Sequence, residues 1–308
     1  MITYPYPAPS YSSTPAALCE MGHKLSVNSI PRLLTELGFR RLGNFKNKET
    51  SDHPDRDAQF EYINAQANSF QVASMPVVSI DTKKKENVGN FKNNGSDYRP
   101  KGSPDEVNDH DFMDETLGKA IPHGIYDTTA NEGWVTVGIT HDTSEFAVNS
   151  LRYWWRNMGM ERYPNADSLL ITADGGGSNG SRVHLWKREL QTFANETGIS
   201  VTVCHYPPGT SKWNKIEHRL FCQITQNWRG KPLTSLLAIV ELIAATTTKT
   251  GLKVRCELDE RTYVKSVKVS DEEFQRINIT KHDFCPSWNY TIRPQDEKHT
   301  TKKSVIIG

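Results

Sequence analysis

The sequence predicts an α/β protein with a mixed sheet flanked by helices and a small helical module before the sheet. Short apolar strands come first after residue 76, and strands then alternate with helices, which is typical of α/β and α+β domains. The nearly apolar run LLIT at 169–172 suits a central strand that is buried on both faces. Near the N-terminus, apolar residues instead recur at helical spacing, which predicts the separate helical module.

Two parts are expected before the sheet. Residues 1–13 are rich in Pro, Ser and Tyr and should be disordered. Residues 14–70 should be helical, with a pair of short helices joined by a turn at Gly22 and a connecting helix from residue 50. Two short helices around a Gly turn are typical of a helix-turn-helix DNA-binding module, although any helical hairpin has this pattern.

The helical pair is expected to be a truncated helix-turn-helix module. Such a module usually needs three helices to bury its own core, and no helix is predicted before the pair. Leu33, Leu34 and Leu37 on the second helix would then be poorly covered. We therefore expect weak sequence preference in DNA binding, even though basic side chains outnumber acidic ones up to Lys48.

Residues 71–291 are expected to form the α/β domain with a C-terminal extension, and the charged tail at 292–308 should be frayed. Strands are predicted at 76–81, 121–127, 133–140, 168–174 and 199–206, and helices at 143–158, 182–196 and 213–228. The basic, Gly- and Asn-rich segment after the first strand is expected to be an ordered loop or hairpin.

Composition limits where the protein works and what it binds. The chain has 308 residues and a formal net charge of +1, and it lacks the run of ~20 apolar residues that a membrane span needs. It begins with neither a basic leader nor an apolar core, and its five cysteines are scattered without a CxxC. These features predict a cytoplasmic protein with no membrane partner. Because the net charge is nearly neutral, a nucleic-acid partner must be argued from local charge and site chemistry.

Three acidic residues stand at the ends of predicted core elements. Asp81 ends the first strand, and Asp174 ends a later strand directly before three glycines. Glu217 falls within the apolar stripe of the helix at 213–228, where no Lys or Arg is placed to pair with it at i±4. A partly desolvated carboxylate needs a cation to remain ionised at neutral pH.

Two interpretations of these acids are open. A single buried glutamate is more often paired with a distant Arg or Lys. Three acids at such positions instead favour a site for Mg²⁺ or Mn²⁺, because these ions prefer oxygen ligands. A pair of such ions can activate a water or a 3′-hydroxyl and stabilise the leaving oxygen in phosphodiester chemistry.

Two other kinds of site are less well supported. No GK[ST] motif is present for a P-loop, and no nucleotide cofactor is expected. Cys204, His205, His218 and Cys222 offer sulfur and imidazole ligands, and the last two have the i, i+4 spacing of a helical zinc pair. Cys204 and His205 are adjacent on a strand, however, so they cannot easily converge on one ion. Cys204 is expected to be a small buried hydrophobe.

The three acids lie in three sequence blocks. These are VSIDTKKKENVGNFKNNG, LLITADGGGSNG and CHYPPGTSKWNKIEHRLF, with NWRGKPL just beyond. In content and order they resemble the DDE transposases of insertion sequences, most closely the group known as Rhodopirellula-type DDE transposases. The resemblance extends from about His53 through SWNYTI. It implies a ribonuclease-H-like fold, with the first acid on the first strand, the second after the fourth strand, and the Glu on a later helix.

The resemblance also implies an activity. A transposase of this kind would nick the ends of its mobile element and join the freed 3′-hydroxyl to target DNA. Asp81, Asp174 and Glu217 would coordinate two Mg²⁺ or Mn²⁺ ions. Double-stranded DNA would be the partner, and the protein would be nucleoid-associated when bound. A homodimer or larger assembly is expected, because two ends are cut. An inactive or domesticated remnant that only binds DNA, and a nuclease without strand transfer, remain alternatives.

Basic residues beside the acids are candidate DNA contacts. They are Lys83, Lys84, Lys85, Lys212, Lys215, His218 and Arg219. The alternative for the three consecutive lysines is a solvated basic loop, because such contacts are long and screened. Trp213, which begins the helix of Glu217, is expected to fill the core.

Overall fold

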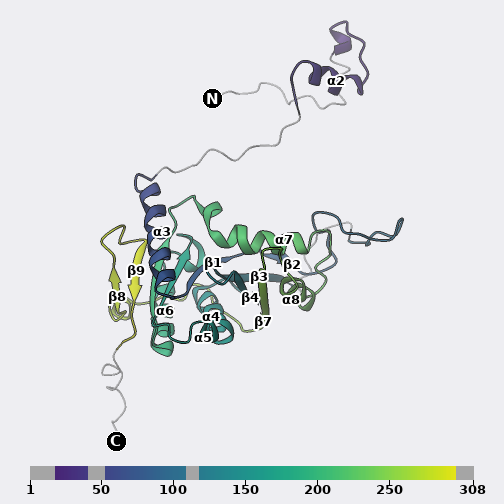
Figure 1. Ribbon diagram of the computed structural model, residues 1–308. Helices are drawn as coiled ribbons and strands as arrows, with labels where there is room; N and C mark the ends of the chain where they lie inside the picture. Colours follow the sequence, from purple (N-terminus) through teal and green to yellow (C-terminus); the bar gives the residue numbers. More distant parts are fainter. Residues whose placement is uncertain (1–17, 41–52, 109–117, 296–308) are drawn as a thin grey trace, which may run out of the picture. The chain divides into compact units, whose positions relative to one another are not determined.

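The computed structural model describes residues 18–40, 53–108 and 118–295 (Figure 1). The chain divides into two compact units, Met1–Glu49 and Thr50–Gly308, and each is described by itself. The start expected to be disordered at 1–13 lies outside the described residues, as does most of the tail at 292–308. No helix in the described ranges is long and apolar enough to cross a membrane.

The first unit contains a short helical turn at 18–20 and helix α2 (Ser29–Glu36). Ile30 is the residue of α2 that is buried, whereas Leu33 and Leu34 are half-buried. Leu37 and Phe39, just after the helix, are exposed. Of the three leucines expected to be poorly covered, Leu37 is therefore exposed and the other two are half-buried. The described residues do not establish a helix-turn-helix module, which stays a prediction.

The second unit is built on one mixed sheet of nine strands (Figure 1). The strands are β1 (Val77–Thr82), β2 (Glu86–Asn87), β3 (Lys119–Asp127), β4 (Glu132–Gly138), β5 (Ser168–Ala173), β6 (Ser200–His205), β7 (Lys253–Asp259), β8 (Ile279–Lys281) and β9 (Asn289–Ile292). Their order is β7-β4-β3-β1-β5-β6-β9-β8, with the short β2 pairing only with β3. β1 is antiparallel to β3 and parallel to β5, and β5 is parallel to β6. The predicted mixed sheet flanked by helices is confirmed.

Helices cover both faces of this sheet. They are α3 (Arg56–Val72), α4 (Ser144–Trp154), α5 (Met160–Arg162), α6 (His184–Thr197), α7 (Cys222–Asn227), α8 (Leu236–Ala244) and α9 (Asp271–Gln275). Two segments are π-helical, η1 (Trp155–Gly159) and η4 (Glu217–Phe221), and two are 3₁₀ turns, η2 (Gly177–Asn179) and η3 (Ser211–Trp213). α4 begins where it was predicted, because the Thr143 side chain accepts a hydrogen bond from Phe146 N.

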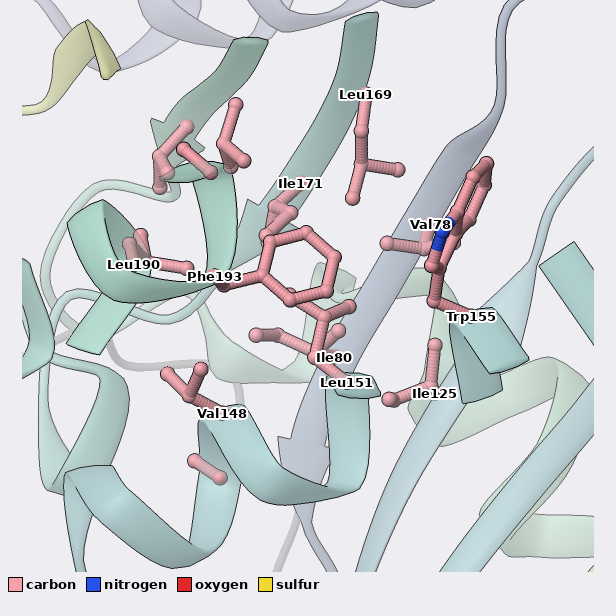
Figure 2. Packing of buried hydrophobic residues seen from close by; sticks show 14 of the residues in the cluster. Val78, Ile80, Ile125, Val148, Leu151, Trp155, Leu169, Ile171, Leu190 and Phe193 are labelled. Atoms are coloured by element: carbon pink, nitrogen blue, oxygen red, sulfur yellow. The ribbon is translucent and has the colours of Figure 1, made fainter. Parts of the chain in front are cut away.

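Alternation along β1 separates two apolar layers. Val78 and Ile80 point to one face, where they pack with Leu151 of α4 and Phe193 of α6 (Figure 2). Val77 points to the other face, where α3 packs against β1, β5 and β6. On that second face α7 and α8 cover β3 and β4. Asp81 follows the same alternation as Val77, so it lies on the face that carries the helix of Glu217.

The structure differs from the sequence-based prediction at the helix expected over 213–228. The chain forms the 3₁₀ turn η3, the π-helix η4 and then α7 instead of one regular α-helix. Trp213 lies in the separate 3₁₀ turn and is 52% exposed, so the prediction that it fills the core is wrong. α8, α9 and strands β7 to β9 were not predicted, and β7 extends the sheet in parallel beside β4.

Candidate active site

Asp81 is held at the end of the central strand β1. Two residues earlier, Ser79 is fully buried and its hydroxyl donates to Asn214 Oδ1. The same hydroxyl accepts a hydrogen bond of 3.1 Å from the backbone N of Ile216. A hydroxyl on β1 thereby fixes the segment directly before Glu217, so two of the three acids share one rigid connection.

Asn214 bonds to Asp174, to the backbone of Glu217 and to the residue before Asp81, and it was missed by sequence reasoning. Its side chain is buried, and Nδ2 donates to Asp174 Oδ1 at 3.1 Å and to the Ile80 carbonyl at 3.2 Å. The backbone carbonyl of Asn214 accepts a hydrogen bond from Glu217 N at 3.1 Å. The one signal in the sequence was that Asn214 precedes Glu217 by three residues. An Asn before a helix is also a common N-cap, so this spacing did not indicate a role in the site.

Asp174 directly follows β5 and is fixed from the opposite side by a histidine. The Asp174 carbonyl accepts a hydrogen bond from His205 Nδ1 at 2.9 Å, and the other ring nitrogen lies 3.1 Å from the Tyr290 hydroxyl. Burial lowers the pKa of His205 to about 4, so the ring is neutral at pH 7. His205 therefore orients the backbone of Asp174 without adding a charge to the site.

Glu217 begins the π-helix η4 and is half-buried. Burial raises its pKa, while the nearby positive charge of Lys83 lowers it. Lys83, two residues after Asp81 and outside the Glu217 helix, therefore acts on Glu217 through its charge, while its ion pair is with Glu86. Lys83 is only 7% exposed; its Nζ lies 2.8 Å from Glu86 Oε1 and 4.4 Å above the ring of Trp228.

Burial and neighbouring acids raise the pKa of both aspartates. Burial, followed by the charge of Asp174, raises the pKa of Asp81 to about 7, and Glu217 and Asp142 add to the effect. Burial raises the pKa of Asp174 to about 6 despite the Asn214 hydrogen bond, and Glu217 adds to it. Neither aspartate forms an ion pair with a Lys or Arg within the described ranges. Such a set of charges favours a cation ligand.

Asp81 and Asp174 line a cavity of about 610 Å³ together with Gly175, Gly176 and Gly177. Asp142 also lines it and accepts a 3.2 Å hydrogen bond from the hydroxyl of Thr82. Asp142 lies between β4 and α4 in a polar loop, where nothing in the sequence distinguishes it. Glu217 is not among the residues that line this cavity.

The donor set was tested for its fit to a divalent ion. Within the described part of the chain, no three His, Cys, Asp or Glu side chains are close enough together to hold one by themselves. Mg²⁺ commonly binds through one or two carboxylates plus waters and substrate phosphates, so the aspartate pair fits that mode. The zinc alternative gains no support: Cys204 packs beneath α3, and Cys222 Sγ donates to the His218 carbonyl.

The candidate DNA contacts fall into two groups. Lys84, Lys85, Lys212, Lys215, His218 and Arg219 are exposed. Lys83 is buried and paired with Glu86, so its geometry argues against the phosphate contact expected for it. A run of three lysines gave no sign of this, because the burial of Lys83 depends on Trp228, far along the chain.

A comparison with protein families identifies the chain. Residues 3–294 match the Rhodopirellula transposase DDE domain. The chain belongs to this family. No curated protein matches this transposase-family chain in sequence.

Solved structures similar to this DDE-domain chain are complexes of the Mos1 transposase. The Mos1 transposase paired-end complex with left transposon end is 13% identical, with a TM-score of 0.45 over 78% of this chain and 72% of that one. The Mos1 mariner paired-end complex with Mn is 13% identical, with a TM-score of 0.42 over 77% and 71%. The Mos1 strand transfer complex is 12% identical, with a TM-score of 0.42 over 78% and 71%.

Proposed function

We propose that the chain is a metal-dependent DNA transposase that cleaves the ends of its mobile element and transfers them into target DNA. Membership of the transposase DDE-domain family supports the general activity. The single observation that supports the detailed site is electrostatic. Burial and the charges of Asp174 and Glu217 raise the pKa of Asp81, and burial and the charge of Glu217 raise that of Asp174. The two aspartates line one cavity, and neither forms an ion pair with a Lys or Arg in the described part of the chain.

Asp81, Asp174 and Glu217 would hold two Mg²⁺ or Mn²⁺ ions. When bound, such ions lower the pKa of an attacking water and stabilise the charge on the leaving oxygen. Asn214 keeps one Asp174 oxygen oriented, and Ser79 keeps the start of the Glu217 helix against β1. The bare backbone at 175–177 leaves room for a DNA phosphate beside the aspartates.

Both reaction steps are phosphoryl transfers that need no energy-carrying cofactor. In cleavage, a water oxygen bonds to phosphorus and the 3′-oxygen of the element leaves with a proton. In strand transfer, that 3′-hydroxyl bonds to a target phosphorus and the 3′-oxygen of the target strand leaves. One bond forms and one breaks in each step, so a single site serves both. Because two element ends must be cut and joined, we propose a homodimer or larger assembly on double-stranded DNA.

Incubation of labelled element ends with the chain and Mg²⁺ or Mn²⁺ tests this proposal. We expect metal-dependent nicks with 3′-hydroxyl ends, followed by joined products in a target duplex. Precut ends with a free 3′-hydroxyl separate transposase from nuclease, because a nuclease gives nicks but no joined product. DNA binding without any metal-dependent product would instead indicate a binding protein and overturn the proposal.

A further inference from the structure

A second hollow, lined by lysines, begins three residues after Asp81 along the chain. Its volume is about 420 Å³. Its charged walls include Lys84 and Lys85 after β1, Lys92 in the loop after β2, and Lys119 at the start of β3. We propose that this hollow, here called the lysine hollow, binds the backbone phosphates of the DNA on which the transposase acts. The inference rests on the proposed function, because it assigns that DNA as the ligand.

The lysine hollow has almost no negative charge of its own. Glu86 supplies a carboxylate to its wall, and that carboxylate is already paired with Lys83 at 2.8 Å. None of the lysines that line the hollow forms an ion pair with the described part of the chain. A sphere of this volume is about 9 Å across, which is comparable to the Debye length of about 8 Å at physiological salt, so screening between the ammonium groups is incomplete and they repel one another. A bound anion would remove that repulsion.

The chemistry of the walls suits a phosphodiester. Asn87, Asn93 and Asn94 also line the hollow, and the Asn93 amide donates to the Trp228 and Lys231 carbonyls, which leaves Asn87 and Asn94 as the candidate amide donors. Lysine and amide side chains are common donors to phosphate oxygens in protein–DNA interfaces. Phe91 and Leu233 form an apolar part of the wall, and both are buried. A wall of lysine and amide side chains with an apolar part fits the sugar-phosphate backbone.

The hollow is a built feature rather than a solvated run of lysines. The loop after β2 is docked on the chain between α7 and α8, which lie at the same end of this unit (Figure 1). Gly89 N donates to the Leu233 carbonyl at 2.8 Å, and Asn93 Nδ2 donates to the Trp228 carbonyl at 3.0 Å. Gly230 N donates back to the Asn94 carbonyl at 3.1 Å. The NWRGKPL block therefore holds the lysine-rich block in place.

The two sites are close along the chain. Lys84 follows Asp81 by three residues, and Lys83 between them is buried over Trp228. A duplex whose scissile phosphate lies at the aspartates would pass the hollow with a neighbouring stretch of backbone. The hollow then supplies affinity and register, while chemistry stays at the acids.

Salt-dependent binding by the full chain tests the lysine hollow. The variant Lys84→Gln, Lys92→Gln, Lys119→Gln removes one charge from each of the three segments. Binding of a fluorescent mixed-sequence duplex is measured without divalent metal between about 50 and 200 mM salt. Loss of three phosphate contacts should make the negative slope of log K against log salt shallower by about three units. The affinity near 100 mM salt should fall on the order of 100-fold.

Two matched variants serve as controls. Lys249→Gln, Lys253→Gln, Lys281→Gln removes the same charge from exposed positions outside the hollow and should leave the slope nearly unchanged. Lys84→Arg, Lys92→Arg, Lys119→Arg keeps the charge and should keep the slope. The proposal is overturned if the hollow variant loses no more affinity than the control, or if the natural chain binds no duplex at low salt.

Nicking of labelled element ends with Mg²⁺ or Mn²⁺ is scored separately, so that the two proposals can fail independently. A natural chain that never nicks, with a hollow variant that loses binding, contradicts the proposed function and supports the hollow. A natural chain that nicks, with a hollow variant that binds like the control, contradicts the hollow and leaves the proposed function standing.

Discussion

The acidic cavity and the lysine hollow begin three residues apart and carry unpaired charge of opposite sign. The aspartates of the cavity are partly buried, and the pKa of Asp81 is raised to about 7, so protons compete for the site at neutral pH. The lysines of the hollow are exposed to solvent and its salt. Burial therefore decides what a ligand must displace: protons in the cavity, and salt counterions in the hollow.

Lys83 stands at the boundary between the two sites. It belongs by sequence to the lysine run but is buried, pairs with Glu86 and lowers the pKa of Glu217. Lys83 is thus buried near Glu217, whereas Lys84 and Lys85 are exposed. If protons compete for the cavity and salt ions for the hollow, substitutions in the cavity should change the pH dependence of the protein. Substitutions in the hollow should change the salt dependence of DNA binding.

The largest effect is expected when the acids are neutralised. Asp81→Asn, Asp174→Asn and Glu217→Gln should each lower metal-dependent nicking by about 10³-fold or more, while the salt slope of DNA binding stays intact. Glu161→Gln, at an exposed acid outside the cavity, is the matched control. Near-normal nicking by any one of the three variants would remove that residue from the site.

A pair of glycine variants tests whether the loop of the lysine hollow is held in place without altering the acidic cavity. Gly230 has φ +72°, and an added Cβ would lie 2.6 Å from the Ser96 carbonyl carbon. Gly198 has nearly the same φ, +73°, with open space around it. Gly198→Ala should cost about 1 kcal/mol of unfolding free energy, and Gly230→Ala about 2–3 kcal/mol because the docked loop must also move.

Chemical denaturation measures both glycine variants, and duplex binding follows. Gly230→Ala alone should flatten the salt slope, because it shifts the loop that carries Lys92. Equal costs for the two variants would show that the loop is not held against Gly230.

Metal-free stability should reveal the repulsion between the acids. Because the pKa of Asp81 is raised in the folded state, the folded chain binds more protons than the unfolded chain between about pH 4 and 7. Its stability therefore falls as pH rises through that window. Asp81→Asn should stabilise the metal-free chain by about 2 kcal/mol at pH 8 and have no effect at pH 4.

At pH 8, saturating Mn²⁺ should make the natural chain more stable than Asp81→Asn, because the ion binds the native site of the natural chain. The thermal midpoint at pH 8 and at pH 5.5, with and without the ion, provides the measurement. A midpoint shift with Mn²⁺ that is as large at pH 5.5 as at pH 8 would contradict protons competing for the site.

The smallest effect is expected from Lys83→Met, which keeps the apolar stem against Trp228 and removes the ammonium group. The pKa of Glu217 should rise, since Lys83 lowers it. Nicking should then fall about 10-fold near neutral pH and recover at higher pH. Lys83→Arg should restore the profile. A rate that falls equally at every pH would assign Lys83 a purely structural role.

The positions of two acids could be predicted because apolar runs identify buried strands. VVSID and LLITAD each end in a carboxylate, and β1 and β5 lie side by side at the centre of the sheet. The core-facing position of Glu217 was also predictable, although the regular helix assumed for it was not. Trp213 was misplaced for that reason: its direction was read from an α-helix that begins later than assumed.

Other parts of the site depend on contacts between distant segments. Asn214, Asp142 and the burial of Lys83 arise from neighbours in space that no local pattern records. β7 is also hidden in the sequence: KVRCELD alternates like any exposed edge strand, and its parallel pairing with β4 depends on the whole sheet. Local patterns therefore predicted the central strands better than the edges and the loops.

The π-helix at Glu217–Phe221 has a consequence for reading related genes. A π turn accommodates one residue more than the corresponding α turn, and it often occurs at functional sites. Loss of a single codon inside this turn would restore an α-helix and rotate Glu217 by about 100° relative to α7. All three acidic codons would survive in such a gene, yet the third carboxylate would face away from Asp174. Among copies of this element, the length of this turn would then distinguish genes for active proteins from genes for inactive proteins that keep all three acidic residues.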